Sequence, residues 1–253
     1  MAVRMNGVRL AFSWLTVLPV RGPEDVDQAV AARAIRLAPV VGVLLGVGAA
    51  GLMWVLTMAG MGGVLAGFVT VAALALATRG MHLDGLADTM DGLGCYGPPE
   101  RAREVMKSGG VGAFGAAALV FAVSIQALSF GALAESGRWP AIALAVAAGR
   151  IAVVLACMLP VEAAPGSGFG VLVAHTQSVP TALAWAIPGV ALAALAIPPY
   201  YSLGPIAVAL ALIAALVMTR HCVRRFGGLN GDILGAALEL TVALVAALAT
   251  LHP

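Results

Sequence analysis

The sequence predicts an all-α protein, a polytopic integral membrane bundle of about seven transmembrane helices. Of its 253 residues, 61% are hydrophobic and only 10% are charged, whereas soluble domains have 45–50% apolar and about 25% charged residues. The apolar residues also form runs close to the roughly 20 residues that a spanning helix requires. Basic residues fall almost entirely outside these runs. We therefore treat residues 1–253 as a single membrane domain.

The individual elements follow from these runs in chain order. The segment 6–20 is too short and too polar for a span, so we expect an interfacial helix, anchored by Trp14, within a cytoplasmic or interfacial segment 1–37. Packed membrane helices tolerate Gly and Pro, so the seven longer runs that contain them still predict spans. The predicted spans are 38–59, 61–78, 111–134, 139–159, 180–197, 203–218 and 233–251.

The basic residues indicate how the spans are oriented. With the N-terminus in the cytoplasm, twelve of the fourteen Lys and Arg residues lie in the inside segments 1–37, 79–110, 160–179 and 219–232. One, Arg138, lies outside, and Arg150 lies within a span. Because cytoplasmic loops are rich in Lys and Arg, the loops large enough to carry chemistry should face the cytoplasm. No basic run suggests nucleic acid as a partner, and the three dispersed cysteines form no metal-binding pattern and predict no disulfide.

Three of the six aspartates, Asp84, Asp88 and Asp91, fall within eight residues. At about 100° per residue, a helix would place all three on one face. Like charges so close repel one another, and a cation would compensate them. Mg²⁺ prefers one or two carboxylates and shares its other positions with water and substrate phosphates. The alternative is a solvated acidic face, but the small and apolar residues between the acids favour a Mg²⁺ site.

The cytoplasmic segment 79–110 also carries basic residues, and we expect it to be a catalytic loop and helix. Arg103 and Lys107 are helical neighbours four residues apart and could hold one anion. Arg79 is a further candidate for binding phosphate. The glycine-rich stretch before the next span could bind phosphate at its backbone N–H groups, or it could simply allow close helix packing. Carboxylates, basic residues and a glycine-rich helix start together predict phosphoryl transfer.

Further candidates lie in other segments. Asp232 precedes the last span and could cap its helix, complete a metal shell or orient a nucleophile, with Asn230 as a neutral polar partner. Arg150 and Glu239 lie at similar depths inside spans, so we expect them to pair, either as a purely structural pair or as the floor of a substrate cavity. His82 could act as a general base or metal ligand, or support the acids through a hydrogen bond.

Taken together, these motifs resemble adenosylcobinamide-GDP ribazoletransferase, the cobalamin synthase family. The resemblance rests on Thr78-Arg-Gly-Met-His-Leu-Asp-Gly-Leu-Ala-Asp-Thr-Met-Asp91-Gly-Leu, on Gly112-Ala-Phe-Gly115 and on Arg225-Phe-Gly-Gly-Leu-Asn-Gly-Asp232. Weaker matches extend it from end to end. The family usually has Thr where Asn230 stands, and it often has a basic residue in the loop that here reads Val161-Glu-Ala-Ala-Pro.

The resemblance implies an enzyme of the bacterial cytoplasmic (inner) membrane that joins adenosylcobinamide-GDP to α-ribazole, or to its 5′-phosphate, and releases GMP. It implies Mg²⁺ as cofactor, held by Asp84, Asp88 and Asp91. The ribazole 3′-hydroxyl would attack the phosphate attached to cobinamide, and Asp91, or else His82, would take its proton. Arg103 and Lys107 would neutralise phosphates. The oligomeric state stays open, with a homo-oligomer as one alternative.

Two other classes of membrane protein share parts of this pattern. A CDP-alcohol phosphotransferase also uses spaced aspartates, but its usual Ala-Arg after the first Asp-Gly is missing after Asp84-Gly85. A transporter could use Arg150 and Glu239 as coupling charges. The polar residues of a transporter are often distributed through the depth of the membrane, whereas those of this chain gather at one surface.

Overall fold

The structure, a computed structural model, describes residues 2–251 and is helical. Within those residues no β-strand forms, and the one isolated β-bridge joins Ala163 to Leu229. The helices are α1 (Ala2–Leu15), α2 (Gln28–Met58), α3 (Gly63–Ala77), α4 (Met81–Gly94), α5 (Pro99–Met106), α6 (Ala113–Glu135), α7 (Trp139–Met158), α8 (Gly168–Val173), α9 (Val179–Leu192), the 3₁₀ turn η1 (Ala193–Leu195), α10 (Leu203–Phe226) and α11 (Gly231–Leu248).

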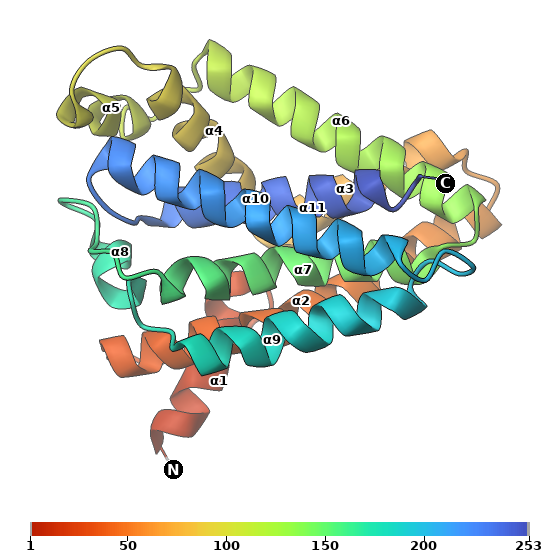
Figure 1. Ribbon diagram of the computed structural model, residues 1–253, viewed down its shortest axis with the longest axis horizontal. Coiled ribbons are helices and arrows are strands. Elements are labelled where there is room, and N and C mark those ends of the chain that lie inside the picture. The colour runs from red at the N-terminus through yellow and green to blue at the C-terminus, as the bar shows by residue number, and fades with distance from the viewer. Residues whose placement is uncertain (1, 252–253) are drawn as a thin grey trace.

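The long helices run along the long axis of the molecule, and the short helices α5 and α8 lie at one end (Figure 1). The core helix is α7, which packs against α2 on one side and α11 on the other. Both α7 and α11 are largely buried, whereas α2, α6 and α10 each keep an apolar face exposed. Exposed apolar helix faces of this extent suit a lipid environment, in which the hydrogen bonds of the backbone must be made within each helix.

Five helices are long and apolar enough to cross a membrane, namely α2, α6, α7, α10 and α11. They correspond to five of the seven predicted spans. The other two predicted spans, 61–78 and 180–197, fall on helices of only 15 and 14 residues, α3 and α9. Counting α3 and α4 as one bent span gives six, so the predicted number of seven is not confirmed.

Several predicted boundaries shift because hydropathy marks the apolar part of a helix and not its full length. The second helix begins at Gln28, ten residues before the predicted span, with the Asp27 side chain accepting from the backbone N–H of Val30. At the same end of the bundle, α10 continues to Phe226 through its polar last turns. The predicted helix at 6–20 ends at Leu15, and Thr16 to Asp27 is irregular.

The chain turns sharply between α3 and α4, which are bent by 93° relative to one another. Arg79 and Gly80 both adopt positive φ angles, 58° and 69°, in this turn. The Arg79 guanidinium donates to the carbonyl oxygens of Ser13 and Trp14, at 2.6 and 3.0 Å. The turn is therefore tied to the end of α1, and it directs α4 towards the end of the bundle that carries α5.

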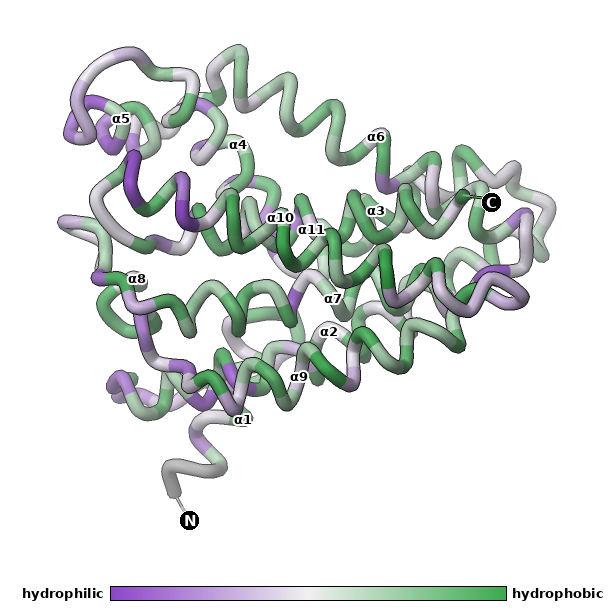
Figure 2. Tube along the Cα trace, viewed as in Figure 1, coloured by the Kyte–Doolittle hydropathy of each residue, from purple (hydrophilic) through white to green (hydrophobic). Residues whose placement is uncertain are grey.

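Hydrophilic residues gather at that same end, around α5, the turn between α10 and α11, and the start of α2 (Figure 2). The predicted separation of charged loops from apolar spans thus has a counterpart in the fold. Helices α4 and α5 occupy the predicted catalytic segment 79–110, and they bring its charges to the polar end of the bundle.

Candidate active site

The three clustered aspartates lie on one helix, α4, as their spacing predicts. Their environments nevertheless differ from one another. Asp84 is exposed, Asp88 is partly buried, and Asp91 is only 8% exposed. The face that they share therefore runs from the surface into the protein, and the three carboxylates are not equivalent.

Asp91 holds the start of α6. Its Oδ2 accepts a hydrogen bond from the Gly112 backbone N–H at 2.7 Å, and its Oδ1 accepts one from Gly115 at 2.8 Å. A Cβ atom at either glycine would collide with this carboxylate. The glycine-rich helix start thus binds an anion, as expected of a helix N-terminus, but that anion is an aspartate of the same chain and not a phosphate.

Asp232 joins the α4 face from the first turn of α11. The Asn230 side chain caps this helix by accepting from Ile233 N at 2.9 Å, so the alternative in which Asp232 is the cap is wrong. The same side chain donates from Nδ2 to Asp232 Oδ2 at 3.0 Å. Because Gly85 has no side chain, α4 packs directly on the backbone of Asp232.

Burial and neighbouring charge confirm that these carboxylates lie close together. The pKa of Asp88 is raised to about 6, mainly by burial and then by the negative charges of Asp84, Asp232 and Asp91. An unfavourable cluster of this kind attracts a cation. Asp84, Asp88 and Asp232 are therefore the acids that the fold brings together at the polar end of the bundle.

A cavity of about 240 Å³ opens beside this cluster. His82, Asp84, Arg150 and Asp232 are its polar lining residues, and the rest of the lining is apolar. Phe169 of α8 and Leu15 of α1 contribute walls that the sequence analysis did not predict. Phe169 stands in the Gly166-Ser-Gly-Phe-Gly170 loop, where an aromatic residue among glycines was the one available signal.

The predicted phosphate-binding residues fall into two groups. Lys107 is exposed, donates weakly to the Gly166 carbonyl oxygen at 3.4 Å, and lines a small pocket together with Arg103, Asn230 and Asp232. Arg103 lies in that pocket but donates to the Phe226 carbonyl oxygen at 2.7 Å and pairs with Glu100 at 2.9 Å. Arg79 is bound to α1. Of these three predicted cations, Lys107 therefore has the weakest hydrogen bonding to the rest of the protein and is the most available to bind a phosphate.

The predicted Arg150–Glu239 ion pair does not form. The ion pairs among the described residues join Arg101 to Glu104 and Arg103 to Glu100, all on α5. Glu239 instead accepts from Gln126 at 2.7 Å, and Arg150 donates to Val146 of its own helix at 3.2 Å. The two residues do line one small cavity between α7 and α11, because side chains of this depth face the bundle interior. Arg150, but not Glu239, also lines the larger cavity beside Asp84.

The acidic side chains can be related to the ligands that a Mg²⁺ ion requires. Over residues 2–251, no three His, Cys, Asp or Glu side chains form a ready-made cation site. Mg²⁺ does not require one, because it binds through one or two carboxylates and keeps its other positions for water and phosphate. The carboxylates of Asp84, Asp88 and Asp232 fit that requirement.

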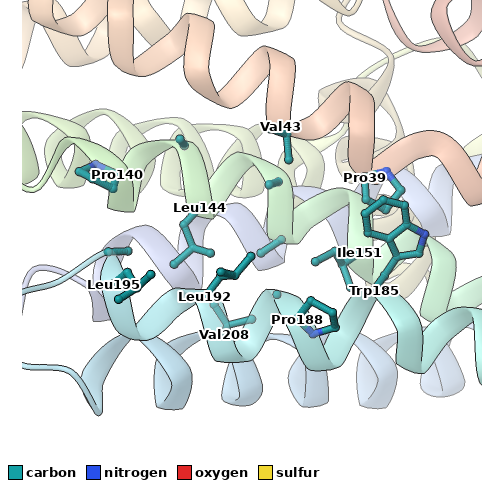
Figure 3. Close-up of a pocket in the computed structure, with 15 residues that line it drawn as sticks. Pro39, Val43, Pro140, Leu144, Ile151, Trp185, Pro188, Leu192, Leu195 and Val208 are labelled. Atoms are coloured by element: carbon teal, nitrogen blue, oxygen red, sulfur yellow. The ribbon is translucent and has the colours of Figure 1, made fainter.

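A second cavity, of about 280 Å³, lies between α2, α7, α9 and α10 (Figure 3). Its lining is apolar throughout, with Pro39, Leu144, Trp185 and Leu192 among the side chains that border it. It holds no titratable group, so it offers nothing for phosphoryl transfer. Of these two cavities, the one beside Asp84 is the one with titratable side chains in its lining.

Comparison with known proteins identifies the family of the chain. The chain matches the family described as cobalamin-5-phosphate synthase over residues 7–250. Adenosylcobinamide-GDP ribazoletransferase of Corynebacterium efficiens is 36% identical, covering 95% of this chain and 90% of the relative. The Frankia casuarinae enzyme of the same name is 41% identical, with 94% and 92% covered. No solved structure matches the chain. The chain therefore belongs to the cobalamin-5-phosphate synthase family and is a membrane transferase of cobalamin biosynthesis.

Proposed function

We propose that this protein transfers the adenosylcobinamide phosphate of adenosylcobinamide-GDP to α-ribazole, or to α-ribazole 5′-phosphate, in a Mg²⁺-dependent reaction that releases GMP. The observation that carries the proposal is the convergence of Asp84, Asp88 and Asp232 beside a cavity with a lysine close by. Diphosphate chemistry depends on placing negative charge among metal ions and basic groups. The names of the relatives agree with this substrate class.

The bonds in this reaction balance without any further reactant. The 3′-oxygen of ribazole forms a new bond to the phosphorus attached to cobinamide. The bridging P–O bond of the diphosphate breaks, and GMP leaves with that electron pair. The hydroxyl proton passes to a carboxylate of the protein.

The positions of the side chains suggest how these tasks are divided. Asp84 and Asp88, one helical turn apart on α4, would hold Mg²⁺, which when bound neutralises charge on the diphosphate. Asp232 lines the cavity and is oriented by Asn230, so it accepts the hydroxyl proton in this scheme. Lys107 neutralises phosphate oxygens. Asp91 and His82, the bases that the sequence favoured, are respectively bound to α6 and buried.

The site is proposed to face the cytoplasm of a bacterial inner membrane. Charged segments gather at the end of the bundle that carries α4 and α5 (Figure 2), and basic residues favour the cytoplasmic side. Adenosylcobinamide-GDP carries a nucleotide and is too polar to reach the site through lipid, so an opening towards the cytoplasm also suits the substrate.

The experiment is GMP release by the purified protein in detergent with adenosylcobinamide-GDP, α-ribazole and Mg²⁺. Asp84→Asn and Asp88→Asn should each lower turnover by about 100-fold or more, because each loses a charge that holds the metal. Asp25→Asn, an exposed aspartate away from the site, is the matched control and should keep full turnover. Circular dichroism and gel filtration establish that each variant is folded. Near-normal turnover of either α4 variant would exclude the proposed metal site.

A further inference from the structure

The cavity beside Asp84 has polar groups at two levels. Its outer end contains Asp84 and Asp232, with Phe169 packed close to Gly231. Its inner end contains Arg150, which lies at the level of Leu238 because Gly149 contacts the backbone of Leu238. Asp232 and Leu238 are six residues apart on α11, a rise of about 9 Å. Between these levels the walls are apolar except for His82, which packs against Gly235. The apolar lining is formed by Ile35, Ala38, Val153, Leu234 and Leu238.

Arg150 has hydrogen-bonding capacity that the protein does not use. The residue is 4% exposed, and its Nη1 donates to Val146 of the same helix. Its Nε has no hydrogen-bond partner among residues 2–251. A guanidinium has five N–H donors, and a buried donor without a partner is costly. Because Arg150 lines this cavity, a ligand that brings an acceptor can pair with its guanidinium.

We infer that this cavity binds the benzimidazole base of α-ribazole, with the free ring nitrogen of the base accepting a hydrogen bond from the Arg150 guanidinium. The inference rests on the proposed function and assigns one of its two substrates to a place. The base is flat, bicyclic and apolar except for that one acceptor nitrogen, which suits a lining that is apolar apart from His82 and the charged groups at its two ends. Its sugar then lies at the outer end, where the 3′-hydroxyl meets Asp84 and Asp232.

The same chemistry explains why other parts of the substrates do not fit here. The corrinoid ring is far larger than a cavity of about 240 Å³, so it stays at the open surface outside α4. A guanine base carries several donors and acceptors on its edge, more than His82 and Arg150 can pair in the inner part of the cavity, so burying it there is unfavourable. The cavity therefore favours the benzimidazole of α-ribazole over the guanine base of adenosylcobinamide-GDP.

Phe169 supplies the aromatic face at the entrance. Its ring packs on Trp14 of α1, with centroids 5.0 Å apart and planes at 54°. This pair fixes α8 against α1 and leaves the ring at the edge of the cavity. Aromatic side chains stack favourably on flat bases.

Binding to the folded, purified wild-type protein tests the inference without any mutation. The probes are 1,5,6-trimethylbenzimidazole and 1,5,6-trimethylindole, which have nearly the same shape and differ in the acceptor nitrogen. We expect the benzimidazole to bind about tenfold more tightly, the effect of one hydrogen bond from a charged donor. Equal binding of the two probes, or no binding of either, would overturn the inference.

Two substitutions of the same type test where the base lies. Val153→Trp fills the cavity and should raise the KM for α-ribazole by about tenfold or more, while the KM for adenosylcobinamide-GDP stays within about twofold. Val47→Trp, on the exposed face of α2 at 60% exposure, is the control and should change neither constant. An unchanged KM for α-ribazole in Val153→Trp would overturn the inference.

Arg150→Lys keeps the charge and removes Nε, so it should abolish the preference for benzimidazole over indole. If it instead raises the KM for α-ribazole 5′-phosphate alone, Arg150 binds the phosphate and the inference is wrong. Failure of the proposed function is recognised separately, because the wild-type protein would then release no GMP while the two probes still report on the cavity.

Discussion

At the scale of single residues, the three aspartates of α4 have the same side chain but different environments. Asp84 is exposed and Asp88 is partly buried, whereas both oxygens of Asp91 are bound to the backbone of α6. Carboxylates in this position act as helix caps, and they also neutralise the positive end of the helix dipole. Asp91, which the sequence favoured as the catalytic base, therefore binds the backbone at the start of α6.

Asp91→Ala should destabilise the protein by about 1–2 kcal/mol, the usual loss when a capping side chain is removed. Thermal unfolding in detergent, followed by circular dichroism, measures the change against the wild type and against Asp25→Asn. A variant that keeps full thermal stability but loses all turnover would assign Asp91 to the chemistry instead.

Asn230 has two tasks that can be separated. Asn230→Ala loses both the cap on Ile233 and the hydrogen bond to Asp232, so we expect about 1 kcal/mol less stability together with a lower turnover. Asn230→Thr keeps a capping oxygen and a hydroxyl donor, and it should retain most of both properties. Steady-state GMP release and thermal unfolding of the two variants decide the matter, and equal turnover in Ala and Thr variants would show that orienting Asp232 is unimportant.

At the scale of elements, the turn between α3 and α4 depends on α1. Arg79 reaches the last carbonyl groups of α1, and Trp14 of the same helix packs on Phe169. The N-terminal helix therefore contacts both the turn that sets the direction of α4 and the short helix α8, which forms one wall of the cavity.

Arg79→Met should release this brace, because methionine keeps the length of the side chain and loses its donors. We expect faster tryptic cleavage after Arg21, in the irregular segment behind α1, with Arg101→Met on α5 as the control. If Arg79 instead binds substrate phosphate, the KM for adenosylcobinamide-GDP would rise while the cleavage rate stays unchanged.

The elements also show what a sequence can and cannot predict. The helix through Asp84 and Asp91 was predictable from spacing alone, and the apolar runs predicted α2, α6, α7, α10 and α11. The bend before α4 was not, since an arginine with positive φ has no sequence signal. The contact of Asp91 with Gly112 depends on how α4 and α6 pack. The hydrogen bond from Gln126 to Glu239, in place of the predicted ion pair with Arg150, likewise depends on the packing of the helices.

At the scale of the whole molecule, the orientation in the membrane is testable with a native thiol. Cys95 follows α4 and is partly exposed, whereas Cys157 and Cys222 are buried. A membrane-impermeant maleimide should label Cys95 in inside-out vesicles and not in right-side-out cells. Ser136→Cys, placed in the Cys95→Ser background in the turn between α6 and α7, should show the reverse pattern. Labelling of Cys95 from outside would place the site on the other side of the membrane.

The residues that line the cavity lie far apart in the sequence, so the ribosome synthesises them at different times. Leu15, Asp84, Arg150, Phe169 and Leu238 all line it, so its first wall exists long before its last. Because membrane helices are inserted from the N-terminus onwards, α1 can pack on α2 early. Its contacts with Arg79 and Phe169 form only after those residues have been made. No fragment ending before α11 can contain a finished site, and the enzyme gains its activity only when nearly the whole chain has been translated.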